Sequence, residues 1–185
     1  MSRSTWFALL LAASSSALAM VPAPVAHNAT CEVWQRELAF AQSVQQHDAA
    51  AFASHLAPDA VFDANTGKPT HGADAIRQHW AAIIAGKTVH LDWYPQQVVA
   101  TADGALAYSS GAYLYEDPAP NAKPRYVIGK FATTWRRGGD GTWRVAFDGG
   151  DEGKPASDAG AVAFRAGRHI QCPTVASAEL PSIRH

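Results

Sequence analysis

The run PDAVFDANTGKPTHGADAIRQHW, from Pro58 to Trp80, decides the fold class of this chain. It predicts a short strand over residues 60–63, a turn rich in Gly, Pro, Asn and Thr, and an amphipathic helix over residues 73–85. The apolar stripe of that helix comprises Ile76, Trp80, Ile83 and Ile84. A short strand and a helix standing before a long extended region indicate an α+β protein.

Two more helices are expected before this run and four strands after it. Thr30 can cap a first helix over residues 31–46, and Asp48 a second, short helix over residues 49–56. Asp-Gly, Pro-rich and Gly-rich loops separate four extended segments, over residues 88–100, 105–116, 125–137 and 142–148. This order predicts a cone-shaped, curved antiparallel sheet with three N-terminal helices packed on its concave face. Such a shape encloses a cavity.

The pairing of the last two strands can be predicted from their side chains. The register that keeps apolar side chains together is a three-residue turn with a bulge, which pairs Trp135 with Trp143, Thr133 with Val145, and Phe131 with Phe147. It also places Lys130 across from Asp148. These two residues then form either a polar centre inside the cone or, as we favour, an ion pair on its convex surface.

The two ends of the chain indicate export to the periplasm or secretion. Residues 1–19 resemble a signal peptide, with Arg3 at the start, an apolar centre over residues 6–13 and the small-residue site Ala17-Leu18-Ala19. No segment approaches the ~20 apolar residues that span a bilayer, so we expect no stable membrane insertion. Residues 20–29 are expected to be a flexible lead-in to a domain over residues 30–152, and residues 153–185 a tail without sustained periodicity.

The net charge and the two cysteines indicate what the protein binds and whether it contains a disulfide. The net charge is −1 and the chain has no cluster of Lys and Arg, which argues against binding to nucleic acid. The two cysteines, Cys31 and Cys172, favour a disulfide in an exported protein, although two separate thiols are the alternative. A bridge that closes so long a loop would contribute about 4–5 kcal/mol in the chain-entropy model.

The element order resembles the SnoaL-like and nuclear transport factor 2-like superfamily. Three segments carry the resemblance: DAVFDANTGKPTHGADAIRQHW, the strand Tyr108–Tyr115 with its central Gly111, and GKFATTWRRGGDGTWRVAFDGG. They look most like an exported bacterial branch of largely unassigned function, and the match covers roughly residues 32–152. The resemblance implies a pocket between the helices and the concave sheet, often with dimerisation through the sheet, and no single activity.

Asp63 is the first candidate catalytic residue. It ends the short strand, in a region where isomerase-like relatives carry their general base, and an apolar cone would raise its pKa. The alternative, which we favour, is a turn-capping Asp bonded to the backbone of residues 64–66. The isomerases carry a Tyr in the first helix where this chain has Phe40, so the resemblance does not extend to their oxyanion hole. Asp148 is the second candidate base.

A set of aromatic and polar side chains is the expected lining of the pocket: His79, Trp80, Trp93, Tyr108, Tyr113 and Lys130. This lining suits a small hydrophobic or aromatic molecule. The alternatives are an ordinary hydrogen-bonded histidine at His79 and ordinary sheet packing of the tyrosines. The histidines lack metal-ligand spacing, and the chain has no phosphate-binding loop or nucleophile elbow, so neither a metal nor a cofactor is predicted.

Three functions are consistent with these features. The first is an exported small-molecule-binding domain with no assigned reaction. The second is a cofactor-free isomerase or lyase that uses Asp63 or Asp148 as its base. The third is a protein-interaction module that presents its sheet to a partner. We expect a homodimer.

Overall fold

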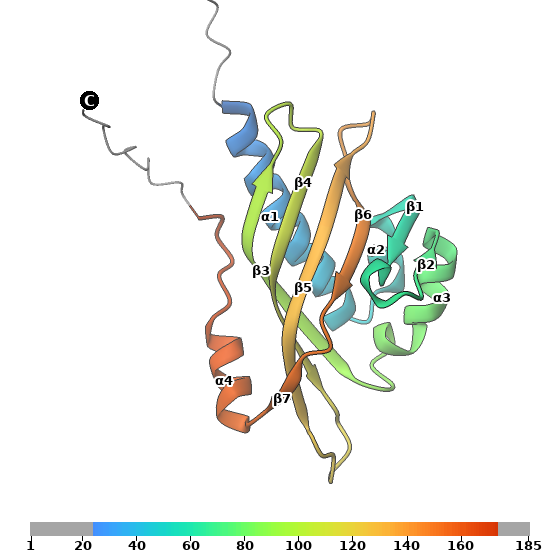
Figure 1. The fold of residues 1–185 in the computed structure, drawn as a ribbon, viewed down its shortest axis with the longest axis vertical. Helices are drawn as coiled ribbons and strands as arrows, with labels where there is room; N and C mark the ends of the chain where they lie inside the picture. Colours follow the sequence, from blue (N-terminus) through green and yellow to red (C-terminus); the bar gives the residue numbers. More distant parts are fainter. Residues whose placement is uncertain (1–23, 174–185) are drawn as a thin grey trace, which may run out of the picture.

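The computed structural model describes residues 24–173 and shows an α+β fold (Figure 1). The helices are α1 (Pro24–Gln45), α2 (Ala49–Ser54), α3 (Ala73–Ile84) and α4 (Asp158–Ala166), with a 3-10 turn over Ala64–Thr66. The strands are β1 (Leu56–Phe62), β2 (Thr70–His71), β3 (His90–Ala100), β4 (Leu106–Glu116), β5 (Tyr126–Arg137), β6 (Trp143–Gly150) and β7 (Lys154–Ala156). The predicted fold class, a curved sheet with helices on its concave face, is confirmed.

The strands lie in the order β2-β1-β6-β5-β4-β3, with β7 added beside β5. All neighbours are antiparallel except β1 and β6, which are parallel. Helix α1 crosses the concave face of the sheet, while α2 and α3 lie beyond β1 (Figure 1). The main core lies between α1 and the sheet, and it is anchored by Trp34, Phe40 and Trp135. Within residues 24–173, no helix is both long enough and apolar enough to cross a membrane.

Helix α1 is longer than the sequence indicated. It begins at Pro24, not at Cys31, so part of the segment expected to be a flexible lead-in is helical. Proline fits the first turn of a helix because its missing N–H would have no partner there. The predicted signal peptide, residues 1–19, lies outside the described residues.

The predicted register of the β5–β6 hairpin is wrong at its turn. Gly138 N–H donates to the Thr142 carbonyl, and Gly141 adopts a φ of +78°, which makes the loop wider than a three-residue turn. Trp135 therefore lies opposite Val145, two positions further along β6 than expected.

A bulge between Thr134 and Trp135 then changes which face of the sheet the rest of β6 presents. Phe147 pairs with Thr134 and points outward, where it is 51% exposed. Asp148 pairs with Thr133 on the concave face. Lys130 does not lie across from Asp148: it pairs with Ala112 of β4, and its side chain is exposed. The expected Lys130–Asp148 pair does not form.

The first part of the tail is regular structure, which the sequence did not indicate. Strand β7 pairs with β5, and the Ser157 hydroxyl caps α4 by accepting from Gly160 N–H. Helix α4 covers one end of the outer face of the sheet through Ala161 and Phe164, and the Phe164 ring lies 4.8 Å from the ring of Tyr94. The helix has only nine residues, and its buried side chains are Ala161 and Phe164 alone, so it was not recognised from the sequence.

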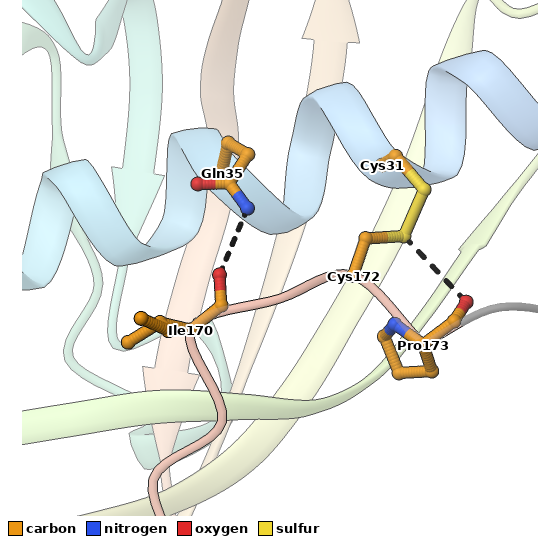
Figure 2. Close-up of a disulfide and its surroundings, with 5 residues drawn as sticks. All are labelled: Cys31, Gln35, Ile170, Cys172 and Pro173. Atoms are coloured by element: carbon orange, nitrogen blue, oxygen red, sulfur yellow. Dashed lines mark hydrogen bonds between the residues drawn. A yellow bond between two sulfur atoms is a disulfide. The ribbon is translucent and has the colours of Figure 1, made fainter.

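The predicted disulfide between Cys31 and Cys172 is confirmed, with 5.3 Å between the two Cα atoms (Figure 2). It fixes the segment after α4 to α1, and Gln35 Nε2 adds a hydrogen bond of 3.0 Å to the carbonyl of Ile170 (Figure 2). Arg168, in the same segment, forms an ion pair with Asp92 of β3. The chain therefore passes the edge strand β3 on its way from the outer face to the helical layer.

Candidate functional site

A cavity of about 580 Å³ lies on the concave side of the sheet, at the end where β6 leaves β5. Its apolar wall is made of five aromatic rings, those of Trp80, Trp93, Tyr113, Tyr115 and Phe131. Its polar wall includes four carboxylates, those of Asp63, Asp148, Asp151 and Glu152. The volume is in the range of small-molecule sites in proteins.

Packing fixes the aromatic wall. The Trp80 ring comes from α3 and lies 5.5 Å from the ring of Phe52, stacked, and 5.4 Å from that of Phe62, edge-on. Tyr113 and Tyr115 are two residues apart on β4, so both side chains point to the concave face. Their rings lie 5.0 Å apart. Rings held in this way offer a preformed apolar surface to a ligand.

Asp63 does not cap the turn that follows it, so the interpretation favoured from the sequence is wrong. Its side chain makes no capping hydrogen bond; the carbonyl of Asp63, not its carboxylate, accepts from the N–H and the hydroxyl of Thr66. The residue adopts the left-handed conformation, with φ of +58°, which is uncommon outside glycine. Its carboxylate is left to line the cavity.

Asp148 is the most deeply set acid of the cavity. It keeps some accessible surface on the cavity side, but its carboxyl group is surrounded by protein atoms. Thr133 Oγ1 donates to Oδ2 at 2.6 Å. Burial raises the pKa of Asp148 well above its ordinary value, the charges of Glu37 and Asp63 raise it further, and the bond from Thr133 offsets part of the rise.

Asp151 holds the end of the cavity together. Its Oδ1 accepts from the backbone N–H of Lys130 at 2.9 Å and of Gly153 at 3.1 Å, and its carbonyl accepts from the Tyr113 hydroxyl at 2.8 Å. Burial, followed by the nearby Tyr115, Asp151 and Glu152, raises the pKa of Tyr113 to about 12. The phenol is therefore protonated at neutral pH and donates its one proton to the Asp151 carbonyl, which leaves its oxygen to accept a hydrogen bond from a ligand.

Beside the cavity lies a buried acid that the sequence analysis missed, Glu37 of α1. It is fully buried and accepts from Trp93 Nε1 at 2.7 Å, Trp135 Nε1 at 2.8 Å and the Ser109 hydroxyl. Burial raises the pKa of Glu37, and these donors offset part of the rise. A sequence signal was present, because Glu37 follows Val33 and precedes Phe40 at helical spacing within the apolar face.

The structure divides the predicted site residues between two faces of the sheet. Asp63, Asp148, Trp80, Trp93 and Tyr113 all line the cavity.

The three others do not. His79 is exposed on α3 and is absent from the cavity wall, since neighbouring positions on a helix point in different directions. Tyr108 and Lys130 line a groove of about 680 Å³ on the outer face of the sheet, because strand alternation directs them away from the helices. Tyr115, Phe131 and the acids after β6 complete the cavity and were not among the predicted site residues.

Residues 38–151 match the family described as SnoaL-like domain. This chain belongs to the SnoaL-like domain family. Domains of this kind often bind small molecules. No curated protein shows a significant match to the sequence.

Solved structures show the same fold at low sequence identity. A nuclear transport factor 2-like protein of unknown function from Pseudomonas putida KT2440 is 20% identical, with a TM-score of 0.56 over 72% of this SnoaL-like chain and 97% of its own. A ketosteroid isomerase-like protein from Erwinia carotovora atroseptica SCRI1043 is 15% identical, with a TM-score of 0.51 over 66% and 92%. An epoxide hydrolase from M. tuberculosis is 16% identical, with a TM-score of 0.51 over 65% and 78%. At these identities the likeness extends to the fold alone.

The cavity of this SnoaL-like domain combines aromatic rings with carboxylates, tyrosine hydroxyls and the side chains of Asn65 and Thr66. Its rings can hold a flat or hydrophobic molecule, and its tyrosine hydroxyls and carboxylates can orient polar groups. Among residues 24–173, no three His, Cys, Asp or Glu side chains are grouped closely enough to hold a metal ion. The chemistry that the described residues offer is therefore hydrogen bonding, ion pairing and proton transfer.

Proposed function

We propose that this SnoaL-like domain is an exported protein that binds a small organic molecule with an apolar or aromatic body. The observation that carries the proposal is the cavity of about 580 Å³ with five aromatic rings in its wall. Cavities of this size and lining are the usual sites of small ligands in proteins. Export is supported by the disulfide, which is typical of oxidising compartments, and by the signal-like residues 1–19.

Native mass spectrometry of protein purified under mild conditions tests this proposal. We expect a bound mass in addition to the polypeptide, and we expect Trp80→Ala to lose it because Trp80 supplies one wall of the cavity. Tyr108→Ala is the matched control, since it removes an aromatic ring from the outer face. A protein that is empty in every preparation would contradict ligand binding.

Asp148 favours a second function, cofactor-free proton transfer. A carboxyl with a raised pKa inside an apolar cavity can remove a proton next to a carbonyl. An isomerase then returns that proton to another carbon, whereas in a lyase the bond from the neighbouring carbon to a leaving group breaks. Asp63 is the alternative base. In a screen of enolisable ketones, we expect Asp148→Asn to lower any turnover by about 100-fold or more. Retained turnover in both Asp148→Asn and Asp63→Asn would remove this candidate.

The outer groove supports a homodimer, or a partner protein in its place. Tyr108 and Phe147 line the groove and are 43% and 51% exposed, and Val99, which pairs with Tyr108 on the next strand, is 50% exposed. Such exposure is unusual for apolar side chains gathered on one sheet face. We propose that a second copy of the chain covers them. The native mass spectrum reports this assembly as well, and Phe147→Glu should shift it to the monomer.

A further inference from the structure

The carboxylates of the cavity form no ion pair with any residue that the structure describes. Asp63, Asp148, Asp151 and Glu152 come from three segments: the end of β1, strand β6, and the residues after β6. No Lys, Arg or His belongs to the cavity wall. Within residues 24–173, none of the four forms an ion pair.

Six acids elsewhere in the described chain, unlike those of the cavity, form ion pairs. All six pair with arginine, namely Glu32, Asp59, Asp74, Asp92, Glu116 and Asp140. Arg36, which takes part in none of these pairs, donates to the carbonyls of Ser54 and Trp143. Every arginine from Arg36 to Arg168 is thus engaged outside the cavity. Lys130 lines the outer groove, which also reaches Asp148 and Asp151, but among the described residues it forms no ion pair with either acid. The wall of the cavity itself holds four acids and no basic side chain.

Asp148 shows the missing partner most directly. Its carboxyl is surrounded by protein atoms and lines the cavity, yet only Oδ2 receives a hydrogen bond, from Thr133. No group in residues 24–173 donates to Oδ1. Burial favours the neutral form of this carboxyl, and a cation placed against its accessible side would favour the charged form, so carboxylate and ligand would stabilise each other.

The cavity rings are likewise without cations, in contrast to the aromatic rings outside. Arg125 and Arg165 lie over Tyr126, at 5.6 Å and 5.8 Å, and Arg137 lies over Trp143 at 4.9 Å. No such contact occurs at the five rings of the cavity among the described residues. Aromatic faces next to carboxylates form the setting that stabilises an organic ammonium group through cation–π attraction and ion pairing together.

A metal ion does not fit the same acids. The four carboxylates are spread around the cavity, and no three acidic, His or Cys side chains in residues 24–173 converge on one point. Calcium and magnesium need six or more oxygen ligands around one centre. A cation with an extended body can instead reach one carboxylate at its charged end while its remainder packs on the rings.

From these contacts we infer that the cavity takes an organic ammonium ion, an amine carried on a flat apolar body. The inference rests on the proposed small-molecule function and adds the charge class of the ligand.

Isothermal titration calorimetry with three probes of one ring system tests the charge: tryptamine, indole-3-acetamide and indole-3-acetate, at pH 7 and low salt. Tryptamine is a cation, the acetamide is neutral and the acetate is an anion. We expect tryptamine to bind roughly tenfold more tightly than the acetamide, since one desolvated cation–π contact supplies about that factor. Indole-3-acetate should bind most weakly of the three.

Variants that each replace one cavity acid with its amide show which carboxylates bind the ammonium group. Asp63→Asn keeps the shape and a residue type that tolerates the left-handed conformation, and Glu152→Gln keeps the shape at the rim. Each should lower tryptamine affinity by about two- to fivefold, the range of a partly exposed ion pair, and leave the acetamide unchanged. Asp158→Asn is the matched control, because it removes an exposed acid from α4, outside the cavity.

The possible outcomes separate the two proposals. If indole-3-acetamide or indole-3-acetate binds as tightly as tryptamine, or if the variants weaken the cation and the neutral probe equally, the ammonium inference fails and small-molecule binding stands. If none of the probes binds and the native mass spectrum is empty, both proposals fail.

Discussion

The concave face of the sheet has two halves, each with one deeply set acid, and the two acids differ in how many hydrogen bonds they accept. In the sealed half, around Glu37, Ser109 and Trp135, the carboxylate receives hydrogen bonds from two indoles and a hydroxyl, and side chains fill the space. In the open half, around Asp148 and Tyr113, the carboxylate receives one hydrogen bond and faces a cavity. A buried acid that accepts hydrogen bonds from several neighbouring side chains stabilises the fold, whereas one that accepts a single hydrogen bond can still bind a ligand.

One strand carries both halves. Ser109 of β4 belongs to the sealed half and Tyr113 to the open half, with Gly111 between them. A Cβ at Gly111 would lie 2.1 Å from the Tyr94 carbonyl oxygen, because β3 bulges toward it between Pro95 and Gln97. Only glycine permits this close approach, so the bulge marks the boundary between the two halves.

Glu37→Ala should break the sealed half with the largest effect. It leaves the Trp93 indole N–H and the Ser109 hydroxyl buried without their acceptor, while the Trp135 indole keeps only its bond of 3.1 Å to Ser109 Oγ. The free energy of unfolding should therefore fall by about 3–5 kcal/mol. Urea denaturation followed by tryptophan fluorescence measures it. A loss below about 1 kcal/mol would mean that the network contributes little to stability.

Acidification should weaken the same half through His55. Its ring packs beside Phe40 and Trp135 and its Nδ1 has no hydrogen-bond partner, and burial, followed by Arg36, lowers its pKa to about 3. In the unfolded chain His55 binds a proton near pH 6.5, whereas in the folded chain it stays neutral until about pH 3. The folded state therefore loses stability as the pH falls below 6.5. Between pH 6.5 and pH 5 we expect a loss of about 2 kcal/mol relative to His55→Gln.

Urea titrations of wild type and His55→Gln at several pH values supply this difference. The comparison with the variant is needed because the raised pKa values of Glu37 and Asp148 act in the opposite direction, favouring the folded state at low pH. Parallel curves for the two proteins would show that His55 is not the source.

Asp148→Asn should have the smallest effect on stability, with the opposite sign. The folded pKa of Asp148 lies above its unfolded value, so its contribution is present at low pH and is lost as the pH rises through the folded pKa. At pH 8 the variant should equal wild type or exceed it by up to about 1 kcal/mol, since Asn carries no charge to bury. Thermal unfolding at pH 8 checks this, and a marked destabilisation would place Asp148 with Glu37 as a structural acid.

The sequence predicted the elements well where their patterns are long. The helical stripe of Ile76 and Ile84, the four long strands and the disulfide all follow from periodicity, loop composition and compartment. Helix α4 was not predicted because it has only nine residues, of which Ala161 and Phe164 alone are buried. It forms because Phe164 finds a partner in Tyr94, a contact between segments distant in the chain.

The site was predictable in its residue types and less so in its geometry. Trp80, Trp93 and Tyr113 line the cavity, whereas Tyr108 and Lys130 face the other way. The decisive difference lies in β6, where the wider turn and the bulge bring Asp148 to the concave face and direct Phe147 outward. A shift of one residue reverses the faces of a strand, and side-chain patterns alone favoured the wrong choice.

The amino-acid sequence by itself determined the class of the fold and the order of its three N-terminal helices and four long strands, because these depend on local pattern and composition. It favoured the pairing of the two cysteines without deciding it. Only the tertiary structure decided which acid is saturated by donors and which is left facing a cavity. That outcome depends on one bulge and one left-handed aspartate, Asp63, and on what packs opposite them. Such contacts join residues far apart in the chain, and no local signal encodes them.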